Sequence, residues 1–252
     1  MKPYAILAFL FACSLFACSA FAADAGKADS TLRDETRQRD IPIEIRFPDP
    51  TYDCSRKHSC PVAFVSPGYG LAHTDYRFVS DALVQLGYMV VSIQSVLPGD
   101  AKAPNTGNMI ADRTPMWTIG ADNLVHAKVV LSKRYPAYDW AHLLLVGHSN
   151  GGDLSALALK RDPALASTLV TLDNRRYPLP VNSRIRVLSI RGSDFEADPG
   201  VLPSGNDQSA ARCIIEIPDA RHDDMNDAGP TWLKDRIARI VFDFLKLDRC
   251  GT

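Results

Sequence analysis

The sequence lacks an excess of charge of either sign. Its 252 residues include 28 lysines and arginines against 29 aspartates and glutamates, and the formal net charge is −1. A protein that binds nucleic acid or an anionic membrane through its overall field needs a marked basic excess. Neither partner is therefore expected. Internal repeats and low-complexity segments are also missing, so one ordinary globular domain is the simplest interpretation.

Long hydrophobic runs are missing beyond the N-terminus. There, a lysine precedes an apolar run over residues 4–17, and Ala20-Phe21-Ala22 has the small-x-small pattern of a signal cleavage site. The run is short for a membrane-spanning helix. We therefore expect residues 1–22 to be a cleaved signal peptide, with a periplasmic or secreted protein and no stable membrane insertion. The alternative is a lipoprotein anchored at Cys18, because the residues before it loosely resemble a lipobox.

A metal-binding spacing is missing from the four cysteines that follow the signal. No Cys-x-x-Cys pair or neighbouring histidine cluster is present, which argues against zinc. An even number of cysteines in an exported chain favours disulfides. Cys54 and Cys60 flank a short polar loop, so a local bridge is expected between them. Cys213 opens the last expected strand and Cys250 follows the last helix, so a second bridge would join the C-terminus to the sheet.

Beyond residue 40, short apolar runs alternate with helix-like patterns. Strands are expected at residues 41–47, 62–65, 89–93, 142–146, 169–172, 185–190 and 214–217. Helices are expected at residues 75–86, 121–131, 150–160 and 230–247, with an irregular stretch at 98–120. This order predicts an α/β domain over residues 41–252, with a mainly parallel central sheet and helices on both faces. The polar residues 23–40 are expected to form a flexible arm.

The most informative motif is Gly147-His148-Ser149-Asn150-Gly151, which lies between a buried strand and a helix pattern. Glycines on both sides of a serine permit a sharp strand-to-helix turn that exposes its hydroxyl group. The helix that follows directs its N-terminal dipole towards negative charge beside the serine. Ser149 is therefore predicted to be a nucleophile, with His148 packed beneath the turn. The alternative is a helix-capping serine in a glycine turn.

A serine nucleophile needs a base and an acid, which follow it in the order Ser, acid, His. His222 is the only histidine after Ser149, and it lies in a loop directly after the last expected strand. For the acid we prefer Asp198, which precedes a Pro-Gly turn. Asp194 is the alternative because it lies closest to the strand end, and Glu196 is a weaker candidate. The acid would accept a hydrogen bond from His222 Nδ1.

The remaining requirement is an oxyanion hole of two backbone N–H groups. Asn150 follows the nucleophile and should supply the first group. The glycine-rich turn 66–70 follows the first central strand and should present the N–H of Tyr69, unless it is an ordinary turn. About a dozen residues separate the strands at 169–172 and 185–190, which is too short for a cap domain. The site is therefore expected to be open and lined by Tyr69, the 105–117 loop and residues 175–177.

Pro67-Gly68-Tyr69, the 147–152 motif and His222 together resemble the α/β-hydrolase family over residues 41–250. The resemblance is greatest to its lidless branch, which holds cutinase-like polyester hydrolases and dienelactone-hydrolase-like esterases. It implies an acyl-enzyme ester hydrolase with Tyr69 and Asn150 as backbone oxyanion donors. Asn150 departs from the family, because many relatives have Met or Gln at that position.

The sequence thus predicts an exported serine hydrolase that cleaves a small-molecule or polymeric carboxylic ester through an acyl-Ser149 intermediate. No metal or organic cofactor is required by this chemistry, and a monomer is expected. A serine peptidase or amidase remains an alternative, since the same residues cleave amides. A catalytically silent hydrolase fold that acts as a binding module is the alternative from a different class.

Overall fold

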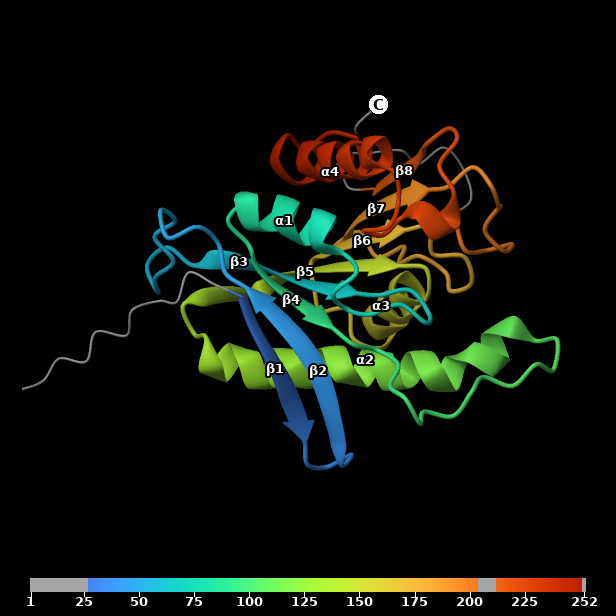
Figure 1. Ribbon diagram of the computed structural model, residues 1–252, viewed down its shortest axis with the longest axis horizontal. Coiled ribbons are helices and arrows are strands. Elements are labelled where there is room, and N and C mark those ends of the chain that lie inside the picture. Colours follow the sequence, from blue (N-terminus) through green and yellow to red (C-terminus); the bar gives the residue numbers. More distant parts are fainter. Residues whose placement is uncertain (1–26, 204–211, 251–252) are drawn as a thin grey trace, which may run out of the picture.

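The computed structural model describes residues 27–203 and 212–250, and these residues build one eight-stranded sheet in the order β1-β2-β4-β3-β5-β6-β7-β8 (Figure 1). β1 pairs with β2, and β2 with β4, in the antiparallel sense, whereas β3 to β8 run parallel to one another. The strands are β1 (Lys27–Asp34), β2 (Arg39–Arg46), β3 (Cys60–Ser66), β4 (Met89–Ile93), β5 (Tyr138–His148), β6 (Thr168–Leu172), β7 (Arg186–Arg191) and β8 (Arg212–Glu216).

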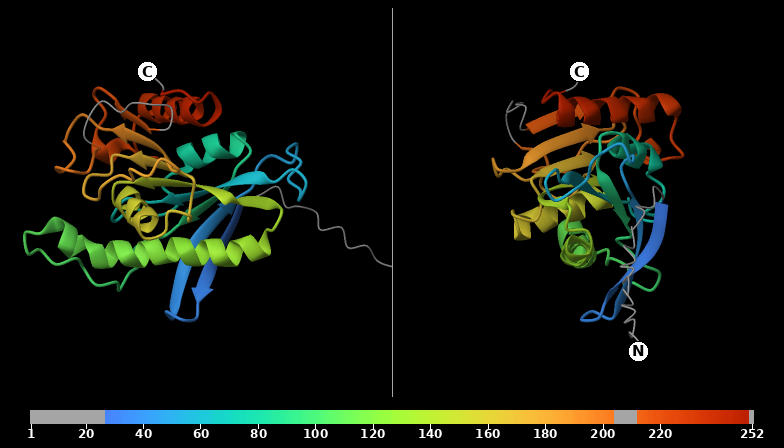
Figure 2. Two further views of the ribbon diagram at one scale, coloured as in Figure 1. Left: turned by 180° about the vertical axis from the view of Figure 1, so that it is seen from behind. Right: turned by 90° about the vertical axis from the view of Figure 1, so that its left-hand side faces the viewer.

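Helices cover both faces of the sheet. The four helices of the described chain are α1 (Arg77–Gln85), α2 (Met109–Arg134), α3 (Asn150–Arg161) and α4 (Thr231–Lys246). α1 and α4 lie together on one face, and α2 and α3 lie on the other, so that the molecule has three layers (Figure 2). The predicted fold class, a mainly parallel sheet with helices on both faces, is confirmed.

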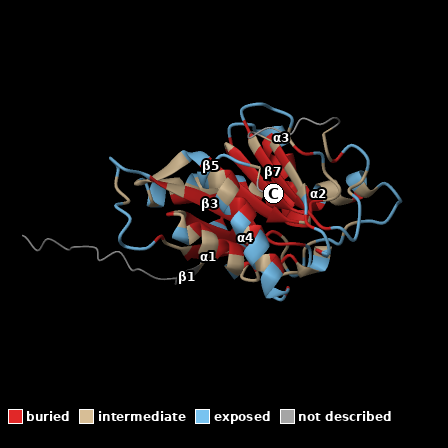
Figure 3. Cartoon of the chain, turned by 90° about the horizontal axis from the view of Figure 1, so that it is seen from above, coloured by how far each residue is buried: buried red, intermediate tan, exposed pale blue. Residues whose placement is uncertain are grey.

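The core lies between these layers, on the two faces of the central strands. β4 and β6 are buried along their whole length, as are most residues of β3, which explains their continuous apolar sequences. Figure 3 shows buried residues, in red, through the middle of the molecule. Trp117 and Leu124 of α2 fill one face, and Leu233 and Phe244 of α4 fill the other. The carboxyl ends of the parallel strands all lie at one edge of the sheet, where loops can bring side chains together.

The N-terminal segment differs from the expected flexible arm. Residues 27–34 form β1, which pairs with β2 over eight positions, from Lys27 opposite Arg46 to Asp34 opposite Arg39. Leu32 is buried, and an ion pair of 2.6 Å between Arg37 and Asp34 closes the turn between the strands. The polar composition did not predict this hairpin, because β1 is an edge strand and one side of it faces the solvent. The signal peptide predicted for residues 1–22 lies outside the described residues.

α2 begins twelve residues earlier than the sequence predicted, at Met109 instead of 121. The Asn108 side chain caps the helix by accepting a hydrogen bond from the N–H of Ala111, at 3.1 Å. Pro115 within the helix has no N–H to donate, which made the segment seem irregular. Burial of Met116 and Trp117 offsets that loss, so tertiary packing sets the start of this helix.

Both predicted disulfides are confirmed. Cys54 is bonded to Cys60 at the start of β3, and Cys213 of β8 is bonded to Cys250 beyond α4. Two disulfides are compatible with an extracellular or periplasmic protein. Within residues 27–203 and 212–250, no helix is both long enough and apolar enough to cross a membrane.

Protein that begins after residue 22 is expected to contain no free thiol, because all four of its cysteines are paired. Titration with a thiol reagent in denaturant, without reductant, should give no signal, and the same titration after reduction should give four thiols per chain. Two or more reactive thiols before reduction would show that at least one bridge does not form in the isolated protein.

Candidate active site

Ser149 lies in a sharp turn between the end of β5 and the start of α3. Its backbone has φ 49° and ψ −115°, a conformation that L-residues rarely adopt. Gly147 and Gly151 make this turn possible. A Cβ atom at either position would lie 2.3 Å or less from backbone atoms, against Gly151 and Ser66 respectively. The two glycines therefore allow α3 to approach the sheet closely, and the turn between them exposes the Ser149 hydroxyl group at the edge of the sheet.

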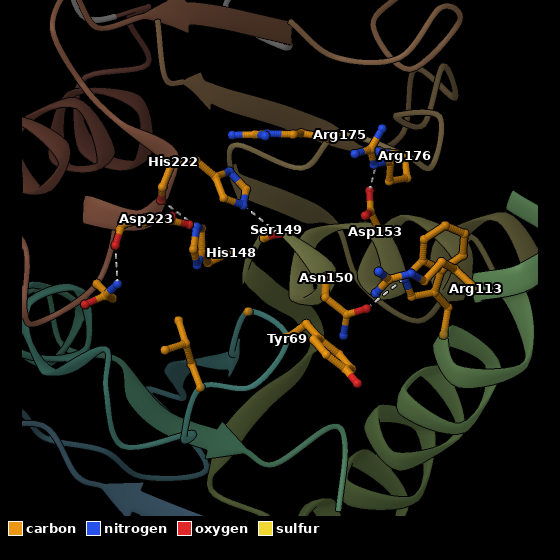
Figure 4. A pocket seen from close by; sticks show the side chains of 14 residues that line it. Tyr69, Arg113, His148, Ser149, Asn150, Asp153, Arg175, Arg176, His222 and Asp223 are labelled. Carbon is orange, nitrogen blue, oxygen red and sulfur yellow. Dashed lines mark hydrogen bonds between the residues drawn. The ribbon is translucent and has the colours of Figure 1, made fainter. Parts of the chain in front are cut away.

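The structure brings His222 to this hydroxyl. His222 begins a short 3-10 helix, η1 (His222–Asp224), in the loop after β8. Its Nε2 atom lies 2.9 Å from Ser149 Oγ, a hydrogen-bond distance for a hydroxyl that donates to a neutral imidazole (Figure 4). The pair predicted from the sequence is thus in contact, although its members are 73 positions apart in the chain.

The carboxylate at the other side of His222 is Asp173. Its Oδ2 atom lies 2.6 Å from His222 Nδ1. Asp173 follows β6 directly, has a positive φ of 51°, and is fully buried. Its Oδ1 atom accepts a hydrogen bond from the N–H of Gly192 at 3.1 Å and pairs with Arg191 at 2.9 Å, while Arg175 Nε donates to Oδ2 at 3.0 Å.

These partners determine the charge of Asp173. Burial raises the pKa of this carboxyl group, but the hydrogen bond from His222 and the positive charges of Arg191 and Arg175 outweigh burial and hold the pKa below its ordinary value. Asp173 is therefore ionised and acts as an acceptor for His222 Nδ1–H. The bond fixes the tautomer in which Nε2 is free to accept the serine proton.

The sequence-based position of the acid was wrong. Asp198 forms an ion pair of 2.5 Å with Arg176 instead of contacting His222. Asp194 accepts a hydrogen bond of 3.0 Å from the backbone N–H of His222, not from its ring. The prediction assumed that the acid follows β7, but β6 ends at the same edge of the sheet, one strand closer to Ser149. An aspartate directly after a buried strand was the available signal for Asp173.

The residues predicted to form the oxyanion hole are both drawn below the serine in Figure 4. Asn150 is the first residue of α3, and its side-chain oxygen accepts a hydrogen bond of 2.9 Å from Trp117 Nε1. Tyr69 lies in the loop after β3, and the guanidinium of Arg113 stacks on its ring at 5.2 Å. Both residues line the cavity that contains Ser149. Their backbone roles stay predictions.

The cavity at Ser149 has a volume of about 350 Å³. Its wall combines charged side chains, among them Arg113, Arg175 and Asp223, with apolar ones such as Leu71 and Trp117. The lining residues are Gly68, Tyr69, Leu71, Arg113, Trp117, His148, Ser149, Asn150, Asp153, Arg175, Arg176, His222, Asp223 and Asn226. Residues 173–185, all of them described, connect β6 to β7 without forming a helix, so this connection carries no cap. The arginines at 175 and 176, expected to line the site, do so.

Asp153 of α3 holds the β6–β7 connection in place. Its Oδ1 atom accepts hydrogen bonds from the backbone N–H groups of Arg176, at 3.0 Å, and Tyr177, at 2.9 Å. Burial raises the pKa of Asp153 to about 6, against the opposing effect of these two bonds. The connection that carries Asp173 is thus fixed to the helix that begins beside Ser149.

His148 lies beneath the turn, as predicted, but it is not a passive packing residue. Its Nδ1 atom is 2.7 Å from Tyr76 Oη, and its Nε2 atom is 3.1 Å from the carbonyl oxygen of His222. Burial lowers the pKa of His148 to about 3, and positive charge on His222 lowers it as well. His148 is therefore neutral at physiological pH. The sequence contained no signal for its two partners.

The buried His148 is expected to make the protein less stable in acid. Because its pKa is about 3 when folded and 6.5 ordinarily, the unfolded chain binds more protons between these values, and stability falls as the pH drops through that range. At about pH 4.5 the loss relative to neutral pH is about 2.5 kcal/mol. Urea unfolding at both pH values gives the loss in the free energy of unfolding for the parent and for His148→Phe. The pH-dependent loss should be smaller by that amount in the variant. The contribution of Asp153 is the same in both proteins and cancels in this comparison. Equal losses of stability in the parent and the variant would contradict the prediction.

A chain that has this sheet order, a serine at the turn after β5 and a helix-free β6–β7 connection has the α/β-hydrolase fold in its lidless form. Solved structures with the same fold support this conclusion. A serine hydrolase without lid from Xanthomonas campestris has a TM-score of 0.62, at 16% identity over 90% of this chain and 96% of that one. A dienelactone hydrolase from Anabaena variabilis has a TM-score of 0.55, at 14% identity over 86% and 96%.

An S-formylglutathione hydrolase from Agrobacterium tumefaciens has a TM-score of 0.53, at 13% identity over 84% of this chain and 92% of that one. These low identities establish the shared fold. Comparison with models of protein families and with curated protein sequences gives no match. In the described part of the chain, no group of three or more His, Cys, Asp or Glu side chains is placed to hold a metal ion.

Proposed function

We propose that the protein is an exported serine hydrolase that cleaves carboxylic esters through an acyl-Ser149 intermediate. The observation that carries this proposal is the hydrogen-bonded series Ser149 Oγ, His222 and Asp173, with distances of 2.9 and 2.6 Å, in an open cavity. A nucleophile, a base and a group that orients the base are the parts that acyl transfer requires.

In the first half of the reaction, Ser149 Oγ attacks the ester carbonyl carbon while His222 Nε2 takes the hydroxyl proton. Asp173 stabilises the imidazolium that forms, and the N–H groups of Tyr69 and Asn150 hold the negative oxygen. The tetrahedral intermediate collapses, the C–O bond to the alcohol breaks, and His222 Nε2 gives its proton to the leaving oxygen. The products are an alcohol and acyl-Ser149.

In the second half, water replaces the alcohol. His222 Nε2 takes a proton from the water as its oxygen attacks the acyl carbon, and the second tetrahedral intermediate again lies against the two N–H groups. Its collapse returns the proton to Ser149 Oγ and releases a carboxylic acid.

The shape of the site favours a small or externally accessible ester. A cavity of about 350 Å³ holds a short acyl group and a small alcohol, and the absence of a cap over the described β6–β7 connection leaves room for a polymeric chain to lie across it. Two of the similar structures are a dienelactone hydrolase and an S-formylglutathione hydrolase, which supports esters as the substrate class. The two disulfides support export.

Labelling and substrate panels test this function. A fluorophosphonate probe should add one label to the folded protein, located at Ser149 by mass spectrometry, and heat-denatured protein should take none. p-Nitrophenyl esters with acyl chains of about two to eight carbons, chosen to suit the volume of the cavity, should be cleaved much faster than matched p-nitroanilides. Faster anilide cleavage would favour the peptidase or amidase, and an unlabelled, inactive protein would favour the silent binding module.

A further inference from the structure

A continuous hydrogen-bonded path crosses the active site beneath the nucleophile. The N–H of Gly68 lies 2.9 Å from Tyr76 Oη, which lies 2.7 Å from His148 Nδ1. His148 Nε2 then lies 3.1 Å from the carbonyl oxygen of His222. The path therefore begins in the loop that carries Tyr69, passes the residue before Ser149, and ends on the backbone of His222.

The chemistry of these groups allows one direction for the path. The carbonyl oxygen of His222 can only accept, so the proton of neutral His148 is on Nε2. Nδ1 is then an acceptor, and the single hydrogen of Tyr76 Oη must point to it. Tyr76 Oη in turn accepts from the N–H of Gly68. Every group in the path is satisfied in this arrangement and in no other with a neutral imidazole.

We propose that Tyr76 and His148 are positioning residues that hold the loop with Gly68 and Tyr69 (the oxyanion loop) and the base His222 at the spacing that acyl transfer requires. This inference rests on the function proposed above. His148 holds the carbonyl group of His222, and Asp194 holds its N–H group at 3.0 Å, so both polar backbone groups of the base are fixed by side chains. The ring of His222 can then turn only about its side-chain bonds, which Asp173 restricts.

The rings of Tyr76, His148 and His222 are closely packed against one another and against the loop at Gly68. Tyr76 and His148 are almost fully buried, and their ring centroids are 5.7 Å apart, while those of His148 and His222 are 4.9 Å apart. A Cβ atom at Gly68 would lie 2.8 Å from His148 Nδ1 and 3.2 Å from Tyr76 Oη. The loop backbone therefore rests directly on the pair, and a shift of either ring moves the loop.

A second contact ties the same two segments together. Asp227, five residues after His222, accepts hydrogen bonds from the backbone N–H groups of Arg77 and Phe78, at 2.9 and 3.0 Å, at the start of α1. Tyr76 is the residue before that helix. The backbone at the start of α1 thus contacts the loop after β8 through Asp227. The hydroxyl group of Tyr76, just before α1, contacts the same loop through His148. A displacement of about 1 Å at a reacting group can cost 100-fold in rate, so such support affects catalysis.

Substitutions can break the two ends of the path separately. Tyr76→Phe removes the hydroxyl group and leaves the N–H of Gly68 without its acceptor. His148→Gln can still donate to the His222 carbonyl, because its amide nitrogen reaches the place of Nε2. His148→Asn has an oxygen near the place of Nδ1 but does not reach that carbonyl. Tyr52→Phe is the matched control, since Tyr52 Oη donates to the Gln85 carbonyl at 2.7 Å, at the opposite end of α1.

Steady-state kinetics on a p-nitrophenyl ester distinguish a positioning role from a structural one. Tyr76→Phe and His148→Asn are expected to lower kcat by about 10- to 100-fold with KM changed less than about threefold, because geometry at the reacting atoms is lost while substrate binding is kept. His148→Gln should recover most of the activity lost in His148→Asn. Tyr52→Phe should match the parent. Melting temperatures confirm that each variant is folded under the assay conditions.

Nitrogen NMR tests the path without relying on activity. In the parent, the ¹⁵N shifts of His148 should show the neutral Nε2–H tautomer throughout the range from about pH 5 to pH 8, where an ordinary histidine titrates. Folded variants with parental kcat, or a His148 that carries its proton on Nδ1, would overturn the proposal. A parent protein that hydrolyses no ester would overturn the catalytic function and this role together, whereas an active parent with insensitive variants would overturn only this role.

Discussion

Ser149→Ala is expected to abolish ester hydrolysis, leaving at most about 10³–10⁴-fold acceleration over the uncatalysed reaction. The variant loses the atom that forms the acyl intermediate, while the cavity, the oxyanion loop and His222 remain. Rates on a p-nitrophenyl ester, measured with the parent and with buffer alone, give the size of the loss. The fluorophosphonate label should disappear at the same time.

Alanine is a suitable replacement because it tests chemistry without disturbing the turn. The strained backbone at φ 49° is set by Gly147 and Gly151, and alanine tolerates this conformation about as well as serine. Loss of one hydrogen bond to His222 should leave the melting temperature close to that of the parent. A folded Ser149→Ala protein with activity near the parental level would refute the acyl-Ser149 mechanism.

Much of the fold could be predicted because burial leaves a strong pattern in the sequence. β4 has the predicted bounds, residues 89–93, since a strand buried on both faces is apolar throughout. α3 begins at the predicted residue because the glycine motif fixes the turn. The β1 hairpin and the first half of α2 could not be predicted, because edge pairing, a side-chain cap and the contacts of Trp117 determine them.

The site shows the same division between local and distant causes. Ser149 was recognisable from its neighbours in the chain, and His222 from its place as the only histidine after it. The acid was not, since Asp173, Asp194 and Asp198 all follow strands that end at one edge of the sheet. What separates them is the reach of His222 Nδ1, which depends on how β6, β7 and the loop after β8 pack together.

Asp173→Asn is the variant that tests the corrected acid. The parental Oδ1 atom accepts a hydrogen bond from the N–H of Gly192 and forms an ion pair with the guanidinium of Arg191, and both contacts favour an oxygen at this place. The amide oxygen of asparagine is therefore expected to occupy that place, and its NH₂ group then faces His222 Nδ1. An amide donor there favours the tautomer with the proton on Nε2, which cannot accept the proton of Ser149. The rate on an activated ester should fall by about 10³- to 10⁴-fold.

Asp198→Asn is the matched control, because it makes the same chemical change at the acid that the sequence favoured. Asp198 is partly exposed and pairs with Arg176, so its loss should change the rate by less than about threefold. Asp173→Asn also removes a counter-charge from buried Arg191, and a lower melting temperature is expected for it alone. Assays well below that temperature separate catalysis from folding. If Asp198→Asn were crippled and a folded Asp173→Asn stayed active, the acid would have to be reassigned to Asp198, and the contact of 2.6 Å between Asp173 and His222 would have no catalytic role.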